Sequence, residues 1–438
     1  MDEKLKRRIN VLVVPSDHMG VGHHRSINPH VKLNELYGDQ FNVEINFNPN
    51  WADLKSFNNY DIIHFHKGLF GDMEVFWTAL DYFKKMGIVT IMDIDDAWDV
   101  GQFHPLFVSN RNQKIPEKIT KNLRLVDYVT TTTDIFANKI KRHNRNVVIV
   151  PNGIDPNDDQ YSPVKNPSDR IRFGFIMGSS HERDMEQFKG VVGQLPKEIL
   201  DKIQIVLCGY DLRGTINTVD KDGKVVGTRN ITPEESVWYT YERNVTNEYS
   251  IVSPAYKDHL LKFIPNLQWP NVENEPYRRE WTLDIKVYGK HYRNVDVLLA
   301  CLDTNQFNEV KSELKFAEAG FTKTALICSN FGPYSLVADS IFKKGGVFDE
   351  KGNCIAIEPS KSHKDWVKYI KKLVENPELI TLLQNNLYDF VKDRYDSNKL
   401  AEKRAEWYKE ILKKDGLRWN SIVQFEEPRP GKTDDEAK

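Results

Sequence analysis

The sequence predicts an α/β protein with two doubly wound, Rossmann-like domains that face each other across a cleft. Short apolar runs alternate with amphipathic helical segments, which is typical of parallel sheets covered on both faces. This alternation occurs twice, on either side of a polar, proline-containing stretch near residues 155–169. The length of 438 residues is too great for one ordinary core and suits two or three domains.

The first domain is expected to span residues 1–155. Continuous apolar runs such as INVLVVP predict strands that are buried on both faces, and segments of helical periodicity separate them. The predicted strands are 9–15, 41–47, 60–68, 88–96, 128–133 and 146–155. The predicted helices are 25–38, 73–87, 115–127 and 134–144. This order indicates crossover connections and one parallel sheet.

A linker at 156–169 leads to the second domain, which is expected to span residues 170–396. Its predicted strands are 170–178, 203–209, 295–302, 324–330 and 352–358, and its predicted helices are 182–195, 308–321, 362–375 and 378–390. An insert at about 211–294 interrupts the alternation, and KDGK within it predicts a hairpin turn. A helical segment at 397–420 is expected to return to the first domain, before a polar tail at 421–438.

The composition is that of a soluble globular protein, with 40% hydrophobic and 28% charged residues. The formal net charge of −2 gives no general attraction to nucleic acid or to an anionic membrane. No apolar run is long enough to span a bilayer, and the N-terminus lacks the features of a signal peptide. The four cysteines are widely spaced in apolar runs without a CxxC pair, which indicates buried thiols in a reducing compartment. We therefore expect a cytoplasmic protein.

The predicted insert is rich in aromatic residues, which raises the question of nucleic-acid binding. Its charges are balanced, because it holds 12 Lys or Arg and 12 Asp or Glu. A balanced segment is a poor partner for a phosphate backbone. We expect these rings to pack in a core, with stacking against sugars as the second interpretation.

The segment DHMGVGHHR at 17–25 follows the first predicted strand. Gly20 and Gly22 would let backbone amides approach a ligand, and Arg25 could neutralise an anion at the start of the next helix. A plain tight turn is an equally good interpretation, because the complete dinucleotide-binding fingerprint is absent.

Two polar motifs, HFH at 64–66 and DIDD at 93–96, end neighbouring predicted strands. Metal binding is one interpretation. It is disfavoured because His64 and His66 point to opposite faces of a strand. We expect Asp93, Asp95 and Asp96 to line the cleft and contact sugar hydroxyls, without a metal.

The turn GSSHERD at 178–184 follows the first strand of the second domain. Gly178 would form the turn and Arg183 would lie in the first helical turn, where a cation is unfavourable unless an anion binds nearby. An ordinary surface arginine is the alternative.

The segment NEVKSELKFAEAGF at 308–321 predicts a helix with two distinct faces. One face is apolar, with Val310, Leu314, Ala317 and Phe321 at helical spacing. The second face carries Lys311, Lys315 and Glu318. This polar stripe is either a solvated i,i+3 ion pair or a binding site for a ligand with phosphates and hydroxyls.

Taken together, these motifs resemble retaining, nucleotide-sugar-dependent glycosyltransferases of the GT-B fold, in the large family 4 group. The resemblance runs from about residue 10 to 413. The motifs that carry it are GVGHHR, IMDIDDAW, VDYVTTTTDIFANKI with VVIVPNGID, GSSHERD, and VDVLLACLDTNQFNEVKSELKFAEAG with SNFGPY. Their order and spacing carry the resemblance, since each motif alone is weak.

The resemblance implies roles for individual residues. Glu318 would bind the ribose hydroxyls, and basic residues would hold the diphosphate. The implied donor-binding residues are Gly178, His181, Arg183, Asn308, Lys311, Ser312, Glu318, Gly332, Pro333 and Tyr334. The implied acceptor-side residues are Gly20, Gly22, Arg25, Asp93 and Asp96. The implied catalytic residues are Asp95 and Lys315. The chain departs from the family pattern at Val310, where a second glutamate is usual.

We therefore expect transfer of a sugar from a nucleoside-diphosphate sugar to a glycan or other acceptor, with retention of configuration and without a cofactor or metal. The expected partners are the nucleotide sugar, the acceptor and a peripheral membrane surface, whereas nucleic acid is not expected. Two alternatives remain open on the same fold. One is a phage-type glycosyltransferase that modifies DNA bases, and the other is a non-catalytic protein that binds sugar nucleotides.

Overall fold

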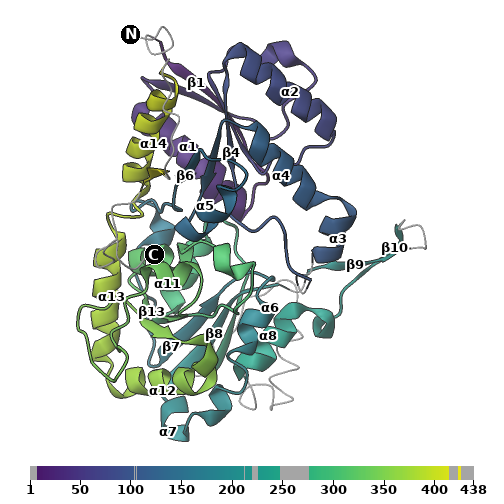
Figure 1. Cartoon of the computed structure of the whole chain (residues 1–438). Helices are drawn as coiled ribbons and strands as arrows, with labels where there is room; N and C mark the ends of the chain where they lie inside the picture. The colour runs from purple at the N-terminus through teal and green to yellow at the C-terminus, as the bar shows by residue number, and fades with distance from the viewer. Residues whose placement is uncertain are drawn as a thin grey trace.

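The protein consists of two α/β domains, each built on a parallel sheet (Figure 1). The computed structural model describes residues 7–102, 104, 106–211, 213–219, 225–246, 276–413 and 423–425. The chain first passes between the domains after β6 (Val147–Ile149) and enters the second at β7 (Ile171–Ile176). It passes back between α13 (Glu378–Val391) and α14 (Ser397–Ile411).

The first domain contains a seven-stranded sheet in the order β15-β6-β5-β4-β3-β1-β2, with parallel neighbours throughout. Besides β6, its strands are β1 (Ile9–Val14), β2 (Phe41–Ile45), β3 (Ile62–His66), β4 (Val89–Asp93), β5 (Tyr128–Thr131) and β15 (Val423–Gln424). The strand order reverses between β1 and β3. Parallel sheets bind ligands at the carboxyl ends of strands near such a reversal, and the predicted acceptor-side residues follow β1 and β4.

Helices cover both faces of this sheet. They are a π-helix (Gly22–Ile27), α1 (Asn28–Tyr37), α2 (Met73–Met86), α3 (Phe107–Asn112), α4 (Ile115–Leu125) and α5 (Asp134–Ile140). Helix α2 shows how local sequence sets the boundaries. Asp72 caps its N-terminus by accepting hydrogen bonds from two backbone amides, and Gly87 ends it in the left-handed conformation at φ 68°.

The second domain contains a six-stranded parallel sheet in the order β11-β8-β7-β12-β13-β14. Besides β7, its strands are β8 (Ile203–Tyr210), β11 (Tyr277–Trp281), β12 (Val297–Ala300), β13 (Ala325–Ser329) and β14 (Ile355–Ile357). Its helices, besides α13, are α6 (Glu182–Glu186), α7 (Lys197–Leu200), α8 (Val237–Thr246), α10 (Leu314–Phe321), α11 (Pro333–Val337) and α12 (Ser362–Glu375).

The predicted insert at 211–294 is only partly separate from the second domain. Strand β11 pairs with β8 and extends the sheet, while Trp238 and Tyr241 of α8 are buried in the domain core. A two-stranded antiparallel hairpin, β9 (Thr215–Val219) with β10 (Val225–Asn230), projects from the molecule (Figure 1). The KDGK turn predicted between these strands lies outside the described residues, as do residues 247–275.

Helix α14 packs against α1 of the first domain, beside which it lies in Figure 1. Trp407 and Tyr408 join the apolar cluster of that domain, where Trp407 contacts the ring of Tyr128 edge-on at 5.9 Å between centroids. The predicted boundary of a polar tail at residue 421 needs correction. Strand β15 pairs with β6 at the edge of the sheet. Phe425 follows this strand directly and is buried against Trp407.

All four cysteines, Cys208, Cys301, Cys328 and Cys354, are buried and free of disulfides. In the part of the chain that the structure describes, no helix is both long and apolar enough to cross a bilayer.

Lys165 is a residue of the linker, and its buried amine forms hydrogen bonds with the second domain. Its Nζ atom donates to the carbonyl oxygens of Tyr292 and Val295, each at 2.9 Å, and to Thr324 Oγ1 at 2.5 Å. Burial lowers the pKa of Lys165 to about 7. Above that pH the folded protein has released a proton that the unfolded chain retains up to about pH 10.5, so this group adds stability as the pH rises.

We therefore expect wild-type protein to gain stability over Lys165→Met between pH 7 and 9, by at most about 1.4 kcal/mol per pH unit. Melting temperatures of the two proteins across this range measure the difference, since methionine does not titrate. Parallel curves would contradict the assignment.

Candidate functional site

Lys311 lies at the interface between the two domains. Its charge interacts with Asp184 of the second domain and with Asp96 of the first. No described carboxylate forms an ion pair with its ammonium group, which lies 5.1 Å from the centroid of the Phe307 ring. Burial lowers the pKa of Lys311, and the two carboxylates oppose that effect. A partly buried cation without a direct ion-pair partner among the described residues favours an anionic ligand.

The helix predicted at 308–321 begins later than expected. A single 3₁₀ turn spans Asn308–Val310, Lys311 is extended at φ −59° and ψ 173°, and the α-helix starts at Leu314. The reason is that the apolar residues of this segment serve two different cores. Val310 packs in a cluster of the first domain, whereas Phe316 and Phe321 pack in the second. Lys311 and Ser312 therefore precede the helix and do not lie on its first turns.

Lys315 and Glu318 form a buried cluster with two tyrosines. Lys315 Nζ donates to Glu318 Oε2 at 2.7 Å and to the Tyr288 hydroxyl at 2.5 Å, and the Tyr292 hydroxyl donates to the same carboxylate at 2.8 Å. Glu318 is completely buried, so the interpretation of this pair as a solvated surface ion pair is wrong. The tyrosines lie in a 3₁₀ helix at Tyr288–Asn294, inside the predicted insert, and no pattern in the sequence marked them.

The turn after β7 is arranged around Asp184. This carboxylate accepts hydrogen bonds from His181 at 2.6 Å and from the Asn308 side chain at 2.6 Å. Arg183 pairs with Asp303 at 3.0 Å, and Gly178 is exposed with open space about its Cα atom. Burial, followed by the charge of Lys311, lowers the pKa of His181.

Beside this turn lies a pocket of about 250 Å³, which we call the α6 pocket. It is lined by Gly101, His104, Ser179, Ser180, Glu182, Arg183, Asp184, Val237, Asn305, Gln306, Phe307 and Asn308. The structure thus brings the predicted residues Arg183 and Asn308 together in one pocket.

The predicted residues Gly332, Pro333 and Tyr334 shape the second domain. Gly332 has φ 56°, and a Cβ atom there would lie 2.8 Å from the carbonyl oxygen of Asn308. Only glycine therefore allows this close approach. Pro333 and Tyr334 are buried at the start of α11, and the Tyr334 ring packs on Phe316 at 5.6 Å between centroids.

In the first domain, the glycine-rich segment after β1 forms a π-helix at Gly22–Ile27. A Cβ atom at Gly22 would lie 1.9 Å from the carbonyl oxygen of Asp17, so this position requires glycine. Asp17 also accepts hydrogen bonds from the amides of Met19 and Gly22. Gly20 precedes the π-helix and has space around it, because a Cβ atom there would lie 3.8 Å from the side chain of Ile285 in the second domain.

Arg25 and Asp93 form a buried ion pair with each other. The guanidinium group donates to both carboxylate oxygens, at 2.7 and 3.0 Å, and also to the carbonyl of Val150 and the side chain of Asn152. Arg25 is 3% and Asp93 1% exposed. The expectation that Arg25 neutralises a bound anion and that Asp93 contacts sugar hydroxyls needs correction, because each already satisfies the other away from solvent.

Unlike Asp93, Asp95 and Asp96 are partly exposed at the surface of the first domain. Asp95 accepts from His66 at 2.9 Å and lies 3.4 Å from Lys67 Nζ. Burial opposes its charge, but Lys67 and His66 hold the pKa of Asp95 below its ordinary value. Burial and the charge of Asp95 raise the pKa of Asp96. His64 points away from them and binds the Tyr408 hydroxyl, as expected for alternate residues of a strand.

His24 belongs to this region although no sequence pattern distinguished it from His23. Burial, followed by the charges of His23, Lys315 and Arg25, lowers the pKa of His24 to about 3. It is therefore neutral at physiological pH. Its Nδ1 atom has no hydrogen-bond partner among the described residues. A neutral imidazole close to Lys315 can donate or accept a hydrogen bond at the cleft.

The segment at 304–312 joins the two domains. Glu309 pairs with Lys139 at 2.6 Å, Ser312 accepts from Asn152 at 3.0 Å, and Val310 is completely buried in the first domain. Ser312 therefore binds a residue of the first domain at the interface. Val310 makes an apolar contact with the same domain.

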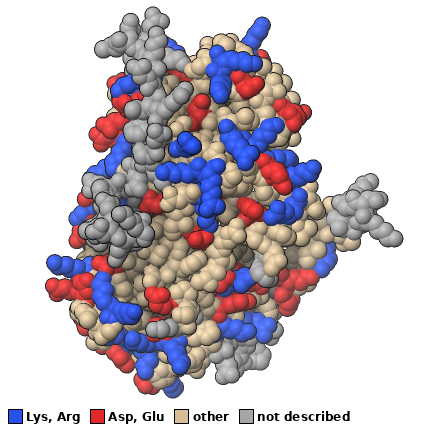
Figure 2. Space-filling model, in the orientation of Figure 1, with Lys and Arg blue, Asp and Glu red and all other residues tan. Residues whose placement is uncertain are grey.

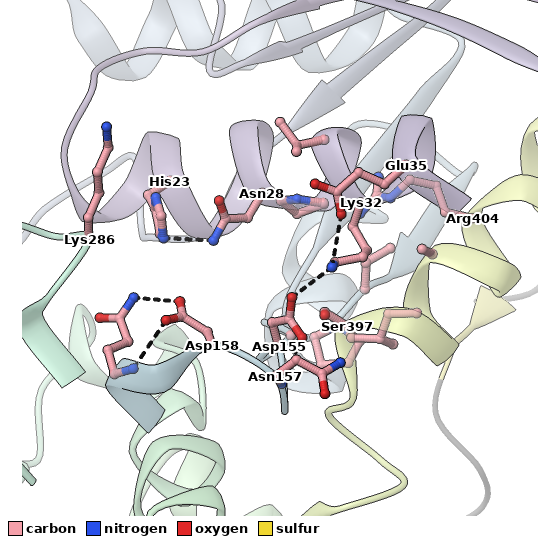
Figure 3. A pocket seen from close by; sticks show the side chains of 18 residues that line it. His23, Asn28, Lys32, Glu35, Asp155, Asn157, Asp158, Lys286, Ser397 and Arg404 are labelled. Carbon is pink, nitrogen blue, oxygen red and sulfur yellow. Dashed lines mark hydrogen bonds and ion pairs between the residues drawn. The ribbon is translucent and has the colours of Figure 1, made fainter. Parts of the chain in front are cut away.

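A second interdomain pocket, of about 340 Å³, lies where the chain passes between the domains (Figure 3). Lys32 of α1 pairs there with Asp155 at 2.7 Å and with Glu35 at 3.0 Å. Arg404 and Ser397 of α14 complete the wall. None of the predicted site residues lines this pocket, so it is separate from the candidate site.

The structure also brings together Cys208, Glu280 and His291, whose ligand atoms lie within 4.8 Å of one another. Glu280 already accepts hydrogen bonds from His291 at 3.0 Å and from Asn294 at 2.5 Å, and it pairs with Arg278. The three residues come from β8, β11 and the 3₁₀ helix at Tyr288–Asn294, so their spacing in the sequence gave no metal-binding signal. These hydrogen bonds satisfy Glu280, whereas Nε2 of His291 has no hydrogen-bond partner among the described residues.

No protein-family model matches the chain, and no curated protein matches it in sequence. Solved structures do resemble it. Anabaena Alr3699/HepE in complex with UDP aligns with a TM-score of 0.55 at 12% identity, over 91% of this chain and 99% of that one. An alpha-glucosyltransferase in complex with UDP-glucose and DNA containing an abasic site aligns with a TM-score of 0.52 at 12% identity, over 92% and 99%.

The catalytic domain of starch synthase IV from Arabidopsis thaliana, bound to ADP and acarbose, aligns with a TM-score of 0.50 at 10% identity, over 93% of this chain and 99% of that one. With two parallel-sheet domains facing each other, the chain has the GT-B fold of glycosyltransferases. At these identities the likeness establishes the fold.

Proposed function

We propose that this protein is a glycosyltransferase that moves a sugar from a nucleoside-diphosphate sugar to an acceptor. The observation that carries the proposal is Lys311, a desolvated cation at the interface without an ion-pair partner among the described residues. It lies just before the N-terminus of α10, where backbone amides also favour an anion. A diphosphate at this place would satisfy both features. The GT-B fold of the chain supports the same assignment.

In the proposed complex, the donor lies on the second domain. Lys311, with Lys315 and Arg183 nearby, would bind the diphosphate. Glu318 would bind the ribose, since its Oε1 atom has no hydrogen-bond partner among the described residues. The turn at Gly178 and His181 and the segment at Asn308 and Ser312 would border the donor, while Gly332, Pro333 and Tyr334 support that segment from behind.

The proposed reaction retains the anomeric configuration by front-face displacement, as the resemblance to family 4 implies. The acceptor oxygen bonds to the anomeric carbon while the bond from that carbon to the diphosphate breaks. The acceptor proton passes to an oxygen of the departing diphosphate. Lys311 would stabilise the charge that develops on the diphosphate. Asp95, which stays ionised beside His66 and Lys67, would accept a hydrogen bond from the acceptor, with Asp96 and Gly22 nearby.

A panel of nucleotide sugars tests this proposal. A donor present at 100 times its dissociation constant should raise the stability by about 2.7 kcal/mol. Slow release of nucleoside diphosphate from the same donor without an acceptor would then distinguish an enzyme from a non-catalytic binding protein. A chain that binds no nucleotide sugar would contradict the proposal. We place the reaction in the cytoplasm, where nucleotide sugars and reduced thiols occur together.

We expect activity to survive EDTA, because Lys311 supplies the positive charge that a metal ion would otherwise provide. The test also bears on the cluster of Cys208, Glu280 and His291, whose residue types could hold a metal ion. We expect no metal there, because Glu280 already accepts two hydrogen bonds from the protein. Turnover of the identified donor should be equal before chelation, after chelation and after addition of Mg²⁺ or Mn²⁺. Loss on chelation that a metal restores would contradict a metal-free reaction.

A further inference from the structure

A large basic pocket lies between α4 and α5 of the first domain, and we call it the α4–α5 pocket. Its volume is about 800 Å³. It is lined by Ala97, Trp98, Asp99, Pro116, Glu117, Thr120, Lys121, Arg124, Phe136, Lys139, Arg142, His143, Gln306 and Val310. Figure 2 shows Lys and Arg side chains gathered over these two helices.

Two of the cations in this pocket have partners elsewhere, since Lys139 is ion-paired and Lys121 lies over the Trp77 ring, whereas the two arginines lack an ion-pair partner among the described residues. Lys139 pairs with Glu309 at 2.6 Å, but no ion pair with a described residue involves Lys121, Arg124 or Arg142. Of the two carboxylates in the lining, Asp99 is bound by Arg111 at 2.8 Å. The side chains of Arg124 and Arg142 are exposed and can reach a ligand. Guanidinium groups bind phosphates and carboxylates through paired hydrogen bonds, so this lining suits an anion.

One wall of the pocket is aromatic. The Trp98 ring stacks on Phe136 at 5.7 Å between centroids, and His143 meets Trp98 edge-on at 5.8 Å. Arg124 and Arg142 line the same pocket as His143, and burial, followed by their charges, lowers the pKa of His143. A pocket that combines apolar rings with a few charged groups suits a ring-bearing ligand with an anionic substituent.

The α4–α5 pocket is next to the candidate site. Gln306 lines both this pocket and the α6 pocket, and its side chain donates to the carbonyl oxygen of Asp99 at 3.5 Å. Trp98 and Asp99 follow Asp95 and Asp96 along the same loop. A ligand held between α4 and α5 can therefore extend past Gln306 toward Asp96 and Lys311.

We propose that the α4–α5 pocket binds the acceptor, and that the acceptor is an acidic sugar whose phosphate or carboxylate contacts Arg124 and Arg142. This inference rests on the proposed glycosyl transfer and adds the chemical class of the acceptor. Trp98 supports the sugar ring, and the anionic group fixes its orientation so that a hydroxyl points into the cleft. A continuous nucleic-acid backbone suits the pocket less well, because Asp99 and Glu117 border the basic side chains.

Binding of simple probes tests the inference without requiring turnover. Titration calorimetry compares glucose, glucose 6-phosphate and glucuronate, so that the last two distinguish a phosphate from a carboxylate. We expect at least one acidic sugar to bind on the order of 10–100-fold more tightly than glucose, as one or two charge-assisted contacts provide. The double variant Arg124→Gln/Arg142→Gln should abolish that preference, while the control Arg145→Gln, an exposed arginine outside the pocket, should keep it.

The possible outcomes separate this inference from the proposed function. Equal affinity for neutral and acidic sugars, or a preference that survives the double variant, overturns the acidic acceptor while donor binding can still be intact. An acidic-sugar preference without any donor binding overturns glycosyl transfer instead. Duplex DNA that binds more tightly than the acidic sugars, and loses this binding in the double variant, replaces the acidic sugar with nucleic acid. Melting temperatures confirm that the double variant is folded, as expected for exposed side chains.

Discussion

Replacing Lys311 with methionine is expected to lower kcat/KM for the donor by about 100-fold, comparable to the loss of one charge-stabilising donor in a water-poor site. The reason is that charge on the diphosphate grows as its bond to the sugar breaks, so the ammonium group acts most strongly in the transition state. kcat should therefore fall together with kcat/KM. Steady-state kinetics with the donor identified from the panel measures both.

The same variant should be at least as stable as wild type without ligand. Lys311 is desolvated and its pKa is lowered, so methionine removes a cost of burial and keeps the apolar stem. Lys344→Met is a suitable control, because Lys344 is exposed in the same domain. Wild-type kinetics in Lys311→Met would show that Lys311 does not contact the diphosphate.

Replacing Arg25 with methionine is expected to lower the free energy of unfolding by about 3–5 kcal/mol, the usual cost of removing one partner of a buried ion pair. Asp93 would stay buried without its cationic partner, with Thr130 as its hydrogen-bond donor at 2.6 Å. The carbonyl of Val150 and the side chain of Asn152 would also lose a donor. Urea unfolding of both proteins measures the change.

A matched control exists at the surface. Arg111 and Asp99 form an ion pair of the same chemistry at 2.8 Å, with side chains 47% and 48% exposed. Arg111→Met should therefore cost less than about 1 kcal/mol. The double variant Arg25→Met/Asp93→Leu should recover much of the stability, since apolar residues of similar size often replace a buried pair without loss. A cost below about 1 kcal/mol for Arg25→Met alone would contradict this account.

The fold followed from local patterns because each strand of a parallel sheet is a short apolar run that can be recognised in the sequence. β1, β3 and β4 lie within the predicted strand ranges, and helix α2 lies within the predicted range 73–87. The predicted helix at 308–321 is longer than the observed one, because helical periodicity places Val310 and Leu314 on the same face of one helix. That rule assumes one core, whereas Val310 packs in the first domain and Leu314 in the second.

The candidate site was less predictable because its contacts join residues far apart in the chain. Arg25 pairs with Asp93, and Glu318 binds Tyr292 from a segment whose place in the fold no periodicity indicated. That Lys311 has no direct ion-pair partner among the described residues could not be foreseen either, since this depends on which side chains the fold brings near it. Sequence patterns identified the charged groups, and only the packing showed which of them already have partners.

The burial of Val310 has a consequence for how fast ligands enter. Separating the two domains would expose this side chain to water, at a cost of about 1.5–3 kcal/mol. Counted alone, the burial of Val310 would limit an opened form to roughly 1–10% of the molecules. For a nucleotide that enters through the open form, the observed association rate falls by the same fraction. A charged side chain at position 310 would lose this apolar contact, so Val310 favours the arrangement in which the two domains touch.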